Sequence, residues 1–204
     1  MARMTGTERR EQLLDTTLQI IARDGFAALS IDAVARAAGI TRPVIYGHFT
    51  DLSGLLNALL DREQMRAISQ LAETIPAAAD DRPVLDIATD ALRGWLEAVA
   101  STPLTWHLVL IPAEGAPRSL HERIERIRAQ VRAQLAAVFA AGLAREGVDP
   151  ETVDLELTAH IAQGASEHAA RLVITEPDAY PVERIMALAE QAAGLVMATL
   201  RTRT

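Results

Sequence analysis

The apolar residues of this chain recur at helical spacing from one end to the other. Positions three and four apart fall on one face of a helix, and the first such run is Leu13, Leu14, Leu18 and Ile21. No stretch alternates convincingly between apolar and polar residues at period two, which is the pattern of a half-buried strand. The chain is therefore predicted to be all-α, with about nine helices and no sheet.

Capping residues and helix breakers divide the first fifty residues into three helices. A helix over about residues 7–23 ends at Gly25, because glycine suits the left-handed conformation that follows a helix. Ser30 is a good N-cap for a second helix over 31–38. Thr41 is the expected N-cap of a third and very short helix.

Longer apolar runs predict six further helices. The helix around Leu120 to Val138 is the most regular, with one apolar stripe and a charged opposite side. Asp149 and Pro150 are expected to cap and open the next helix, which runs to about Thr175. In chain order the predicted ranges are about 51–76, 83–100 and 103–110, then the helix that contains the stripe over 120–138, then 150–175 and 181–201.

Residues 30–49 have the sequence SIDAVARAAGITRPVIYGHF, which predicts a helix, a tight turn at Gly39 and a second short helix. Apolar residues such as Val34, Ile40 and Ile45 can face inward. This is the helix-turn-helix arrangement, in which the second helix lies in the major groove of DNA with its amino end near the base edges. The sequence therefore indicates a DNA-binding module.

The second helix leaves outside this core side chains of kinds that contact DNA: Thr41, Arg42, Pro43, Val44, Tyr46 and His48. The guanidinium fork of Arg42 pairs with guanine or with phosphate. Pro43 and Val44 offer apolar contact to a thymine methyl group. The hydroxyl and imidazole groups on the same segment can bond to phosphate oxygens.

The distribution of charge matters more than its sum. The chain carries a net charge of −7, with 20 arginines, no lysine and 27 acidic residues, which by itself argues against a polyanionic partner. Residues 1–50 contain six arginines and five acidic residues, so the acidic excess lies in the rest of the chain. Such asymmetry indicates different partners for the two segments, although the first is only weakly basic.

Residues 7–67 as a whole resemble the DNA-binding domain of the TetR family of bacterial transcriptional repressors. The similarity rests on a short signature: Gly39-Ile40-Thr41-Arg42-Pro43, Tyr46, His48-Phe49 and Leu55-Leu56. Phe26 after the first helix matches the family pattern too. The resemblance implies that the third helix reads DNA, with base contacts from Arg42, Pro43 and Val44 and phosphate contacts from Ser30, Thr41, Tyr46 and His48.

For residues 68–204 the resemblance implies a larger helical domain for ligand binding and dimerisation. Regulators of this family hold a small ligand among the C-terminal helices and form a homodimer through the last two. A ligand that binds the DNA-free form more tightly would release the protein from a palindromic operator. The expected partners are double-stranded operator DNA, an unidentified small-molecule effector and a second copy of the chain, with no cofactor.

Large side chains are scarce in the alanine-rich C-terminal part and are natural candidates to line a ligand pocket. They are Trp95, Trp106, His107 and Phe139. The alternative is that they fill the core, where tryptophan and histidine find local hydrogen-bond partners.

One predicted helix carries a polar stripe: Glu156, His160, Gln163, Glu167 and Arg171. A solvated face or a ladder of ion pairs explains such a stripe, and contact with a ligand is the alternative for His160 and Gln163. Glu156 and His160 are spaced to share a metal ion. No third ligand accompanies them at a diagnostic spacing, so no metal site is predicted.

Several classes of function are excluded by what the sequence lacks. It contains no cysteine, no G-x-S-x-G motif, no phosphate-binding loop and no H-E-x-x-H motif. No apolar run reaches the ~18 residues that span a bilayer, and the first residues contain no apolar signal segment. A cytoplasmic protein without enzymatic activity or a membrane partner is therefore expected.

A second interpretation is a helical protein-interaction adaptor that has lost strong DNA binding. The family usually has a lysine at the start of the fourth helix, where it meets the phosphate backbone, and here that position is Leu52. Gly47 replaces the larger side chain that is usual before His48. Steep salt dependence of binding to a duplex would distinguish a regulator from an adaptor.

Overall fold

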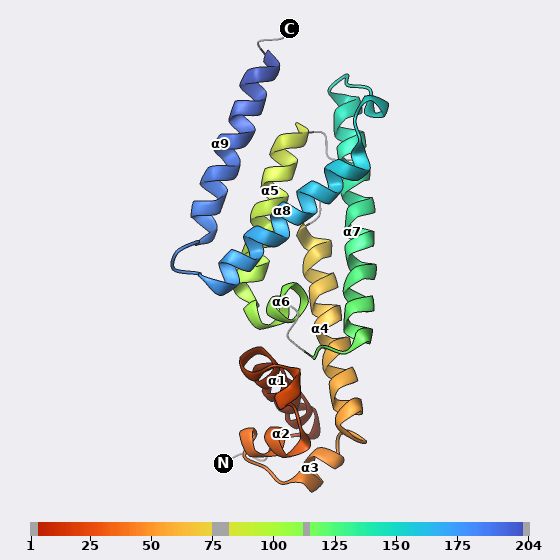
Figure 1. The fold of residues 1–204 in the computed structure, drawn as a ribbon, viewed down its shortest axis with the longest axis vertical. Helices are drawn as coiled ribbons and strands as arrows, with labels where there is room; N and C mark the ends of the chain where they lie inside the picture. The colour runs from red at the N-terminus through yellow and green to blue at the C-terminus, as the bar shows by residue number, and fades with distance from the viewer. Residues whose placement is uncertain (1–3, 75–81, 112–114, 202–204) are drawn as a thin grey trace. The chain divides into compact units, whose positions relative to one another are not determined.

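The computed structural model describes residues 4–74, 82–111 and 115–201, which fold into nine α-helices and two 3-10 helices without a strand (Figure 1). The predicted all-α class and number of helices are thus confirmed. The α-helices are α1 (Gly6–Asp24), α2 (Ile31–Ala37), α3 (Arg42–Tyr46), α4 (Leu52–Thr74), α5 (Val84–Ser101), α6 (Pro103–Leu110), α7 (Arg118–Arg145), α8 (Leu155–Thr175) and α9 (Val182–Arg201). The 3-10 helices are η1 (Phe26–Ala28) and η2 (Pro150–Thr152).

Side-chain caps set the beginnings of the first helices. The hydroxyl of Thr5 accepts from the amide of Glu8, and the Glu8 carboxylate accepts from the amide of Thr5, which makes a capping box for α1. Ser30 caps α2 as predicted, because its hydroxyl accepts from the amide of Ala33 at 3.1 Å. Thr41 is the N-cap of α3 as predicted, although its side chain makes no capping hydrogen bond.

The helix expected from residue 150 begins later, at Leu155. Asp149 caps only η2, where its side chain accepts from a backbone amide of that turn. Val153 is then extended, at φ −117° and ψ 131°. Asp154 caps α8 by accepting from the amide of Leu157 at 3.0 Å. The predicted start is wrong because the chain carries two capping aspartates in succession, and the second begins the α-helix.

The chain packs as two compact units, and neither is continuous in sequence. The first comprises Met1–Ala67 and Leu104–Ile124, and the second comprises Ile68–Pro103 and Glu125–Thr204. The expected division into a DNA-binding domain over 7–67 and a ligand-binding domain over 68–204 concerns function and stays a prediction. The packing differs from that division in placing Leu104–Ile124 in the first unit.

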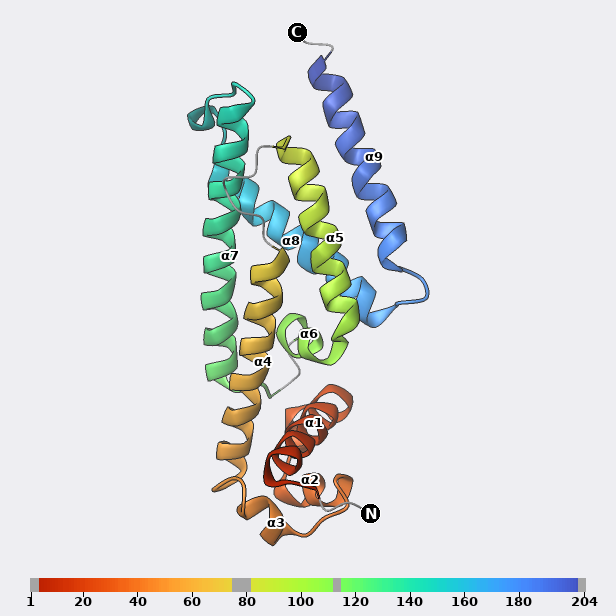
Figure 2. The ribbon, with the colours of Figure 1, turned by 180° about the vertical axis from the view of Figure 1, so that it is seen from behind.

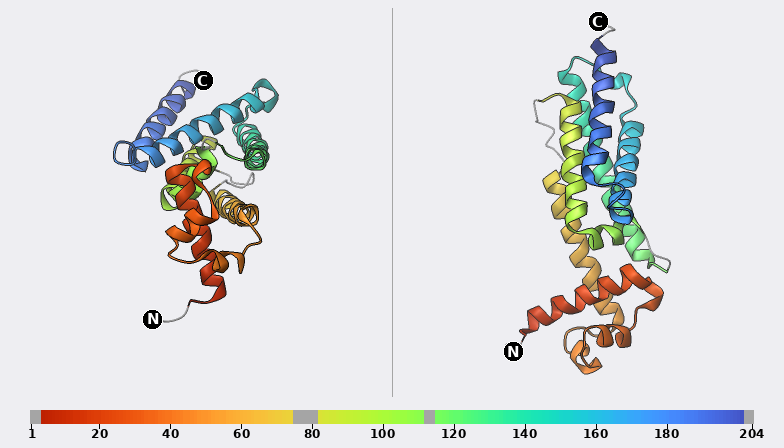
Figure 3. Two further views of the ribbon diagram at one scale, coloured as in Figure 1. Left: turned by 60° about the horizontal axis from the view of Figure 1, so that its bottom comes forward. Right: turned by 90° about the vertical axis from the view of Figure 1, so that its left-hand side faces the viewer.

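The core of the first unit is one apolar cluster built from several helices. Leu13 and Val34 are fully buried in it, together with Ile45 of α3 and Leu55 of α4. Figure 3 shows α2 and α3 lying together beside the longer α1. Three residues from the later segment complete the cluster: Leu108, Leu120 and Ile124. Burial of these apolar side chains explains why that segment packs with the first unit.

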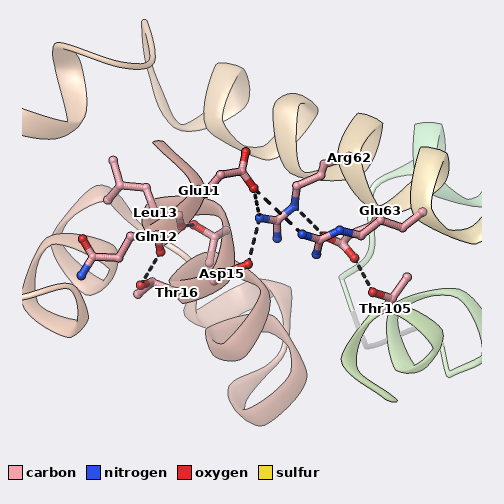
Figure 4. Close-up of polar contacts among 10 residues, drawn as sticks. Glu11, Gln12, Leu13, Asp15, Thr16, Arg62, Glu63 and Thr105 are labelled. Carbon is pink, nitrogen blue, oxygen red and sulfur yellow. Dashed lines mark hydrogen bonds and ion pairs between the residues drawn. The ribbon is translucent and has the colours of Figure 1, made fainter. Parts of the chain in front are cut away.

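A buried carboxylate lies among the polar groups of this unit (Figure 4). Glu63 is 1% exposed, and it accepts from Arg62 Nε at 2.8 Å and from the Thr105 hydroxyl at 2.5 Å. Arg62 in turn pairs through Nη1 with Glu11 and Asp15, both at 2.8 Å. Burial disfavours the charged form of Arg62, but these acidic partners outweigh it and raise the pKa of the guanidinium above its ordinary value. The network thereby links α1, α4 and α6.

The second unit is organised around α5. This helix packs against both α8 and α9 (Figures 1 and 2), and Arg93 of α5 pairs with Glu190 of α9 at 2.7 Å. Its buried face includes Ile87, Leu96 and Val99. None of the helices in the described part of the chain combines the length and the apolar character that crossing a membrane requires.

Candidate nucleic-acid interface

The turn between α2 and α3 has a geometry that glycine favours. Gly39 has φ +66°, in the left-handed region that side chains with a Cβ rarely adopt. The amide of Ile40 then donates to the carbonyl of Ala35 at 3.0 Å, a helix-ending bond that fixes the direction of the chain. The turn predicted at Gly39 is confirmed, and it brings α3 against α2.

Only one residue of α3 is buried. Ile45 is 0% exposed and Phe49, just after the helix, is 6% exposed, so these two side chains anchor the segment in the core. A helix of five residues is far too short to be stable alone, and this anchoring must hold it. The remaining side chains are exposed: Thr41, Arg42, Pro43, Val44 and Tyr46. They form the outer face that we call the α3 face.

The start of α3 leaves the Thr41 hydroxyl outside the helix. An N-cap side chain normally accepts from the amide of the second or third helical residue. Here the second residue is Pro43, which has no amide hydrogen, and the amide of Val44 donates to the backbone carbonyl of Thr41 at 3.0 Å. Thr41 therefore presents an exposed hydroxyl beside Arg42, as a contact to DNA needs.

Two further predicted phosphate contacts lie at the margins of the α3 face. Ser30 is exposed, and its hydroxyl accepts the capping bond but keeps its own hydrogen to donate. His48 is half-buried, with its Cε1 only 3.9 Å from the position of a Cβ added to Gly6, so the imidazole lies near the amino end of α1. Arg10 of α1 stacks on the Phe49 ring, with 4.9 Å from its Cζ to the ring centroid.

An ion pair across the motif was not predicted from the sequence. Arg42 Nε donates to Asp32 Oδ1, and Arg42 Nη2 donates to Asp32 Oδ2. Asp32 lies in the first turn of α2, ten residues before Arg42. The sequence shows only an acid and an arginine, each near the start of one helix of the motif. Their separation of ten residues does not indicate a contact, because the turn between the helices is what brings them together.

The structure divides the residues predicted as ligand contacts between the two units. Trp106 and His107 lie on α6 in the first unit, where Trp106 is 1% exposed. Burial lowers the pKa of the His107 imidazole below its ordinary value, because it disfavours the charged form. The other four lie in the second unit: Trp95, Phe139, His160 and Gln163.

The four candidates of the second unit differ in environment. Trp95 and Phe139 are half-buried, and the Trp95 indole donates to the carbonyl of Ser166 at 3.4 Å. His160 is exposed. Gln163 is 7% exposed and its amide oxygen accepts from Arg132 at 3.1 Å.

The polar stripe of α8 takes part in ion pairs between helices. Arg128 of α7 donates to both carboxylate oxygens of Glu167, at 3.0 and 2.8 Å. Burial disfavours charge on Arg128, but Glu125 and Glu167 outweigh that effect and raise the pKa of its guanidinium. Arg171 lies 3.8 Å from the same Glu167 carboxylate. Within the described residues, no group of three or more side chains is arranged to hold a metal ion.

The known proteins that this chain resembles are transcriptional regulators. The family model described as "Bacterial regulatory proteins, tetR family" matches residues 13–59. An uncharacterised HTH-type transcriptional regulator of Mycobacterium tuberculosis is 26% identical over 170 residues, which are 83% of this chain and 69% of that protein. The HTH-type transcriptional activator FasR of Mycolicibacterium smegmatis is 30% identical over 95 residues, 47% of this chain and 43% of FasR.

Solved structures share the fold. A TetR-like transcriptional regulator from Rhodococcus sp. RHA1 has a TM-score of 0.74 at 24% identity, covering 96% of this chain and 99% of that one. The regulator FadR from Bacillus subtilis, solved in complex with stearoyl-CoA, has a TM-score of 0.65 at 16% identity, covering 91% and 96% of the two chains.

Proposed function

The chain belongs to the TetR family of bacterial transcriptional regulators, and from this premise we propose that it is a one-component repressor that binds a palindromic operator as a homodimer. A small molecule bound within residues 68–204 releases it from the DNA. Residues 7–67 are the DNA-binding domain in this proposal, and 30–49 are its helix-turn-helix motif.

The observation that carries the proposal is the α3 face. Its side chains are exposed while Ile45 and Phe49 anchor the segment, so a folded core supports a short helix whose outer side chains do not fill that core. Arg42, Pro43 and Val44 supply contacts to bases. The hydroxyl and imidazole groups around them supply contacts to phosphates: Ser30, Thr41, Tyr46 and His48.

The homodimer is supported by exposed apolar residues on the last two helices. On α8, Leu157 is 54% exposed and Ile161 is 64% exposed, with Gly164 and Ala165 one turn further along. On α9, Leu188 is 68% exposed. Large apolar residues exposed on two helices of a single chain are typical of a surface that a partner covers. A two-fold dimer places its two DNA-binding domains on the two halves of a palindrome.

The effector in this proposal is an apolar small molecule, and side chains of the second unit support this. Trp95 of α5 and Phe139 of α7 are half-buried aromatic groups in an alanine-rich unit, as at the lining of a ligand site. The structural neighbour FadR was solved with stearoyl-CoA, a ligand with a long apolar chain. His160 and Gln163 are the polar groups that would orient such a ligand, whereas the deep burial of Trp106 suits the core-filling alternative.

The first experiment is a selection from a pool of duplex fragments from around the gene, at two salt concentrations. The protein is expected to select a palindromic sequence with nanomolar affinity and steep salt dependence. Arg42→Ala is expected to weaken that binding by at least about tenfold, because a bidentate contact to guanine contributes about 1–3 kcal/mol. Arg118→Ala removes an exposed arginine of the first unit outside the motif, and it is the matched control.

Failure to select any sequence at low salt would contradict the proposal and favour the adaptor.

If an operator is found, deleting the gene raises transcription from that site for a repressor and lowers it for an activator. The protein–DNA complex then serves to screen for effectors, with stearoyl-CoA as the first compound. Phe139→Ala is expected to blunt release by an effective compound while leaving operator affinity unchanged.

A further inference from the structure

We propose that Asp32 is a positioning residue that makes Arg42 selective for guanine. The inference rests on the proposed function, because it assigns a role at the DNA-binding surface. It starts from the bidentate pair in which Nε and Nη2 of Arg42 each donate to one carboxylate oxygen of Asp32. Since Asp32 lies in the first turn of α2 and Arg42 is the first residue of α3, the pair joins the beginnings of both helices of the motif.

The pair lies at the surface, where DNA can reach it. The side chain of Arg42 is 60% exposed and that of Asp32 is 53% exposed. Exposed ion pairs add little to the free energy of folding, so stability gives no reason for this one. Its geometry matters instead for what Arg42 presents to a partner.

The pairing determines which edge of the guanidinium stays available. Arginine has five N–H donors in one plane, and Asp32 takes one from Nε and one from Nη2. Both donors of Nη1 and the second donor of Nη2 remain available. One donor of Nη1 and that donor of Nη2 form the outer edge of the plane, a fork that suits O6 and N7 of guanine. Because Asp32 holds the side chain in one rotamer, Arg42 loses less conformational freedom when it meets the base.

The carboxylate also makes phosphate a poorer partner. An unpaired arginine is attracted to every phosphate of a duplex, whereas the Asp32–Arg42 pair is close to neutral and the carboxylate repels phosphate oxygens. The outer fork keeps its directional hydrogen bonds, which an uncharged guanine edge accepts. Asp32 thereby favours the base over the phosphate, the two roles that the sequence leaves open for Arg42.

Parallel selections from a random duplex pool test this with the full-length protein, Asp32→Ala and Arg42→Ala. The unchanged protein is expected to select a palindrome containing, in each half-site, a G·C pair whose preference disappears in Arg42→Ala. In Asp32→Ala the preference for that pair is expected to fall about tenfold, which is ~1.4 kcal/mol. Binding to random duplex is expected to tighten, with a log–log salt slope steeper by about 0.9 for each DNA-binding domain.

Asp24→Ala is the matched control. Asp24 also pairs bidentately with an arginine, Arg23, in the first unit but outside the motif. Its removal changes the net charge equally and is expected to leave the base preference unchanged. Thermal unfolding of both variants checks that each still folds, and a purely structural role of Asp32 would not alter the preference at one base pair.

An undiminished preference for the G·C pair in Asp32→Ala would overturn the inference. An equal gain in affinity for all sequences would give that result, and it is what removing a merely competing carboxylate would produce. Selection of no sequence by the unchanged protein would refute the proposed function and the inference with it. A selected palindrome whose G·C preference is the same in Asp32→Ala refutes the inference alone.

Discussion

Glu63 is an acidic residue in a place where charge is costly. Its carboxylate is 1% exposed, with Arg62, Arg66 and the Thr105 hydroxyl around it. Removing this acceptor leaves the buried donors that point at it without a partner, which costs more free energy than an average hydrogen bond contributes. The Glu63 carboxylate therefore joins α4 to α6 through its hydrogen bond with Thr105.

Glu63→Ala is expected to lower the free energy of unfolding by about 1–3 kcal/mol, because Arg62 Nε and the buried Thr105 hydroxyl lose their acceptor, while Glu11 and Asp15 still pair with the Arg62 guanidinium. Urea unfolding followed by circular dichroism measures this. Glu122→Ala removes an acid whose pair with Arg118 is exposed, and it is expected to cost at most about 1 kcal/mol. Equal effects of the two substitutions would contradict the role assigned to Glu63.

His107 gives the first unit a dependence on pH. Burial lowers the pKa of its imidazole in the folded state, so the unfolded chain takes up the proton first as the pH falls. The stabilisation is therefore present above the unfolded-state pKa of about 6.5 and is lost as the pH falls through the lower pKa of the folded state.

In thermal unfolding, the midpoint is expected to fall between about pH 7.5 and about pH 5.5. His107→Gln should reduce that fall by roughly 1–3 °C, because glutamine takes up no proton. His121→Gln removes an exposed imidazole of the same unit and is the control. The explanation fails if the unfolding midpoint of each variant falls as much over this pH range as that of the unchanged protein.

Between elements, α7 approaches the start of α5 more closely than a side chain allows. A Cβ added to Gly142 would lie 2.7 Å from both Cβ and Cγ2 of Val84. These atoms are held close to the backbone of α5, so they cannot move aside cheaply. Glycine weakens a helix interior, and its presence here is explained by this contact.

Gly142→Ala is expected to destabilise the protein by about 1–3 kcal/mol, because overpacking outweighs the gain in helix propensity. Gly94→Ala is the matched control, since its Cβ would meet Thr74 at an ordinary 3.5 Å. That variant should be stabilised by about 0.5–1 kcal/mol. Urea midpoints that shift in the same direction for both variants would argue against a close approach at Gly142.

At the scale of the whole molecule, the proposed dimer determines how the DNA is read. A symmetric interface uses the same surface of both chains, so one substitution acts twice. Ile161 is 64% exposed on α8 and is one of the apolar residues that the partner would cover in the proposed dimer.

Ile161→Glu is expected to weaken the dimer by about 100-fold or more, because two carboxylates would be buried against apolar groups. Sedimentation velocity at micromolar protein measures the change from dimer to monomer. Met65→Glu alters an apolar residue of α4 that is even more exposed, at 73%, and should leave the dimer intact. Unchanged sedimentation of Ile161→Glu would place the interface elsewhere.

The helices and the α3 face follow from the sequence because they depend on local physics. Apolar spacing, the Ser30 cap and Gly39 act over a few residues, and each is enough to predict an element or its end. The predicted start of α8 at Pro150 was wrong for a local reason too, since two capping residues compete. The outward side chains of α3 then follow from the anchoring of Ile45.

Contacts between distant parts of the chain could not be predicted in this way. Glu63 meets Thr105 across 42 residues, and Leu104–Ile124 joins the first unit instead of the second. Even Asp32 and Arg42, ten residues apart, meet only through the turn between their helices. The pattern of a helix tells which face is buried, but not which other helix covers it. Packing of whole faces makes that choice, and with it the surroundings of every buried charge.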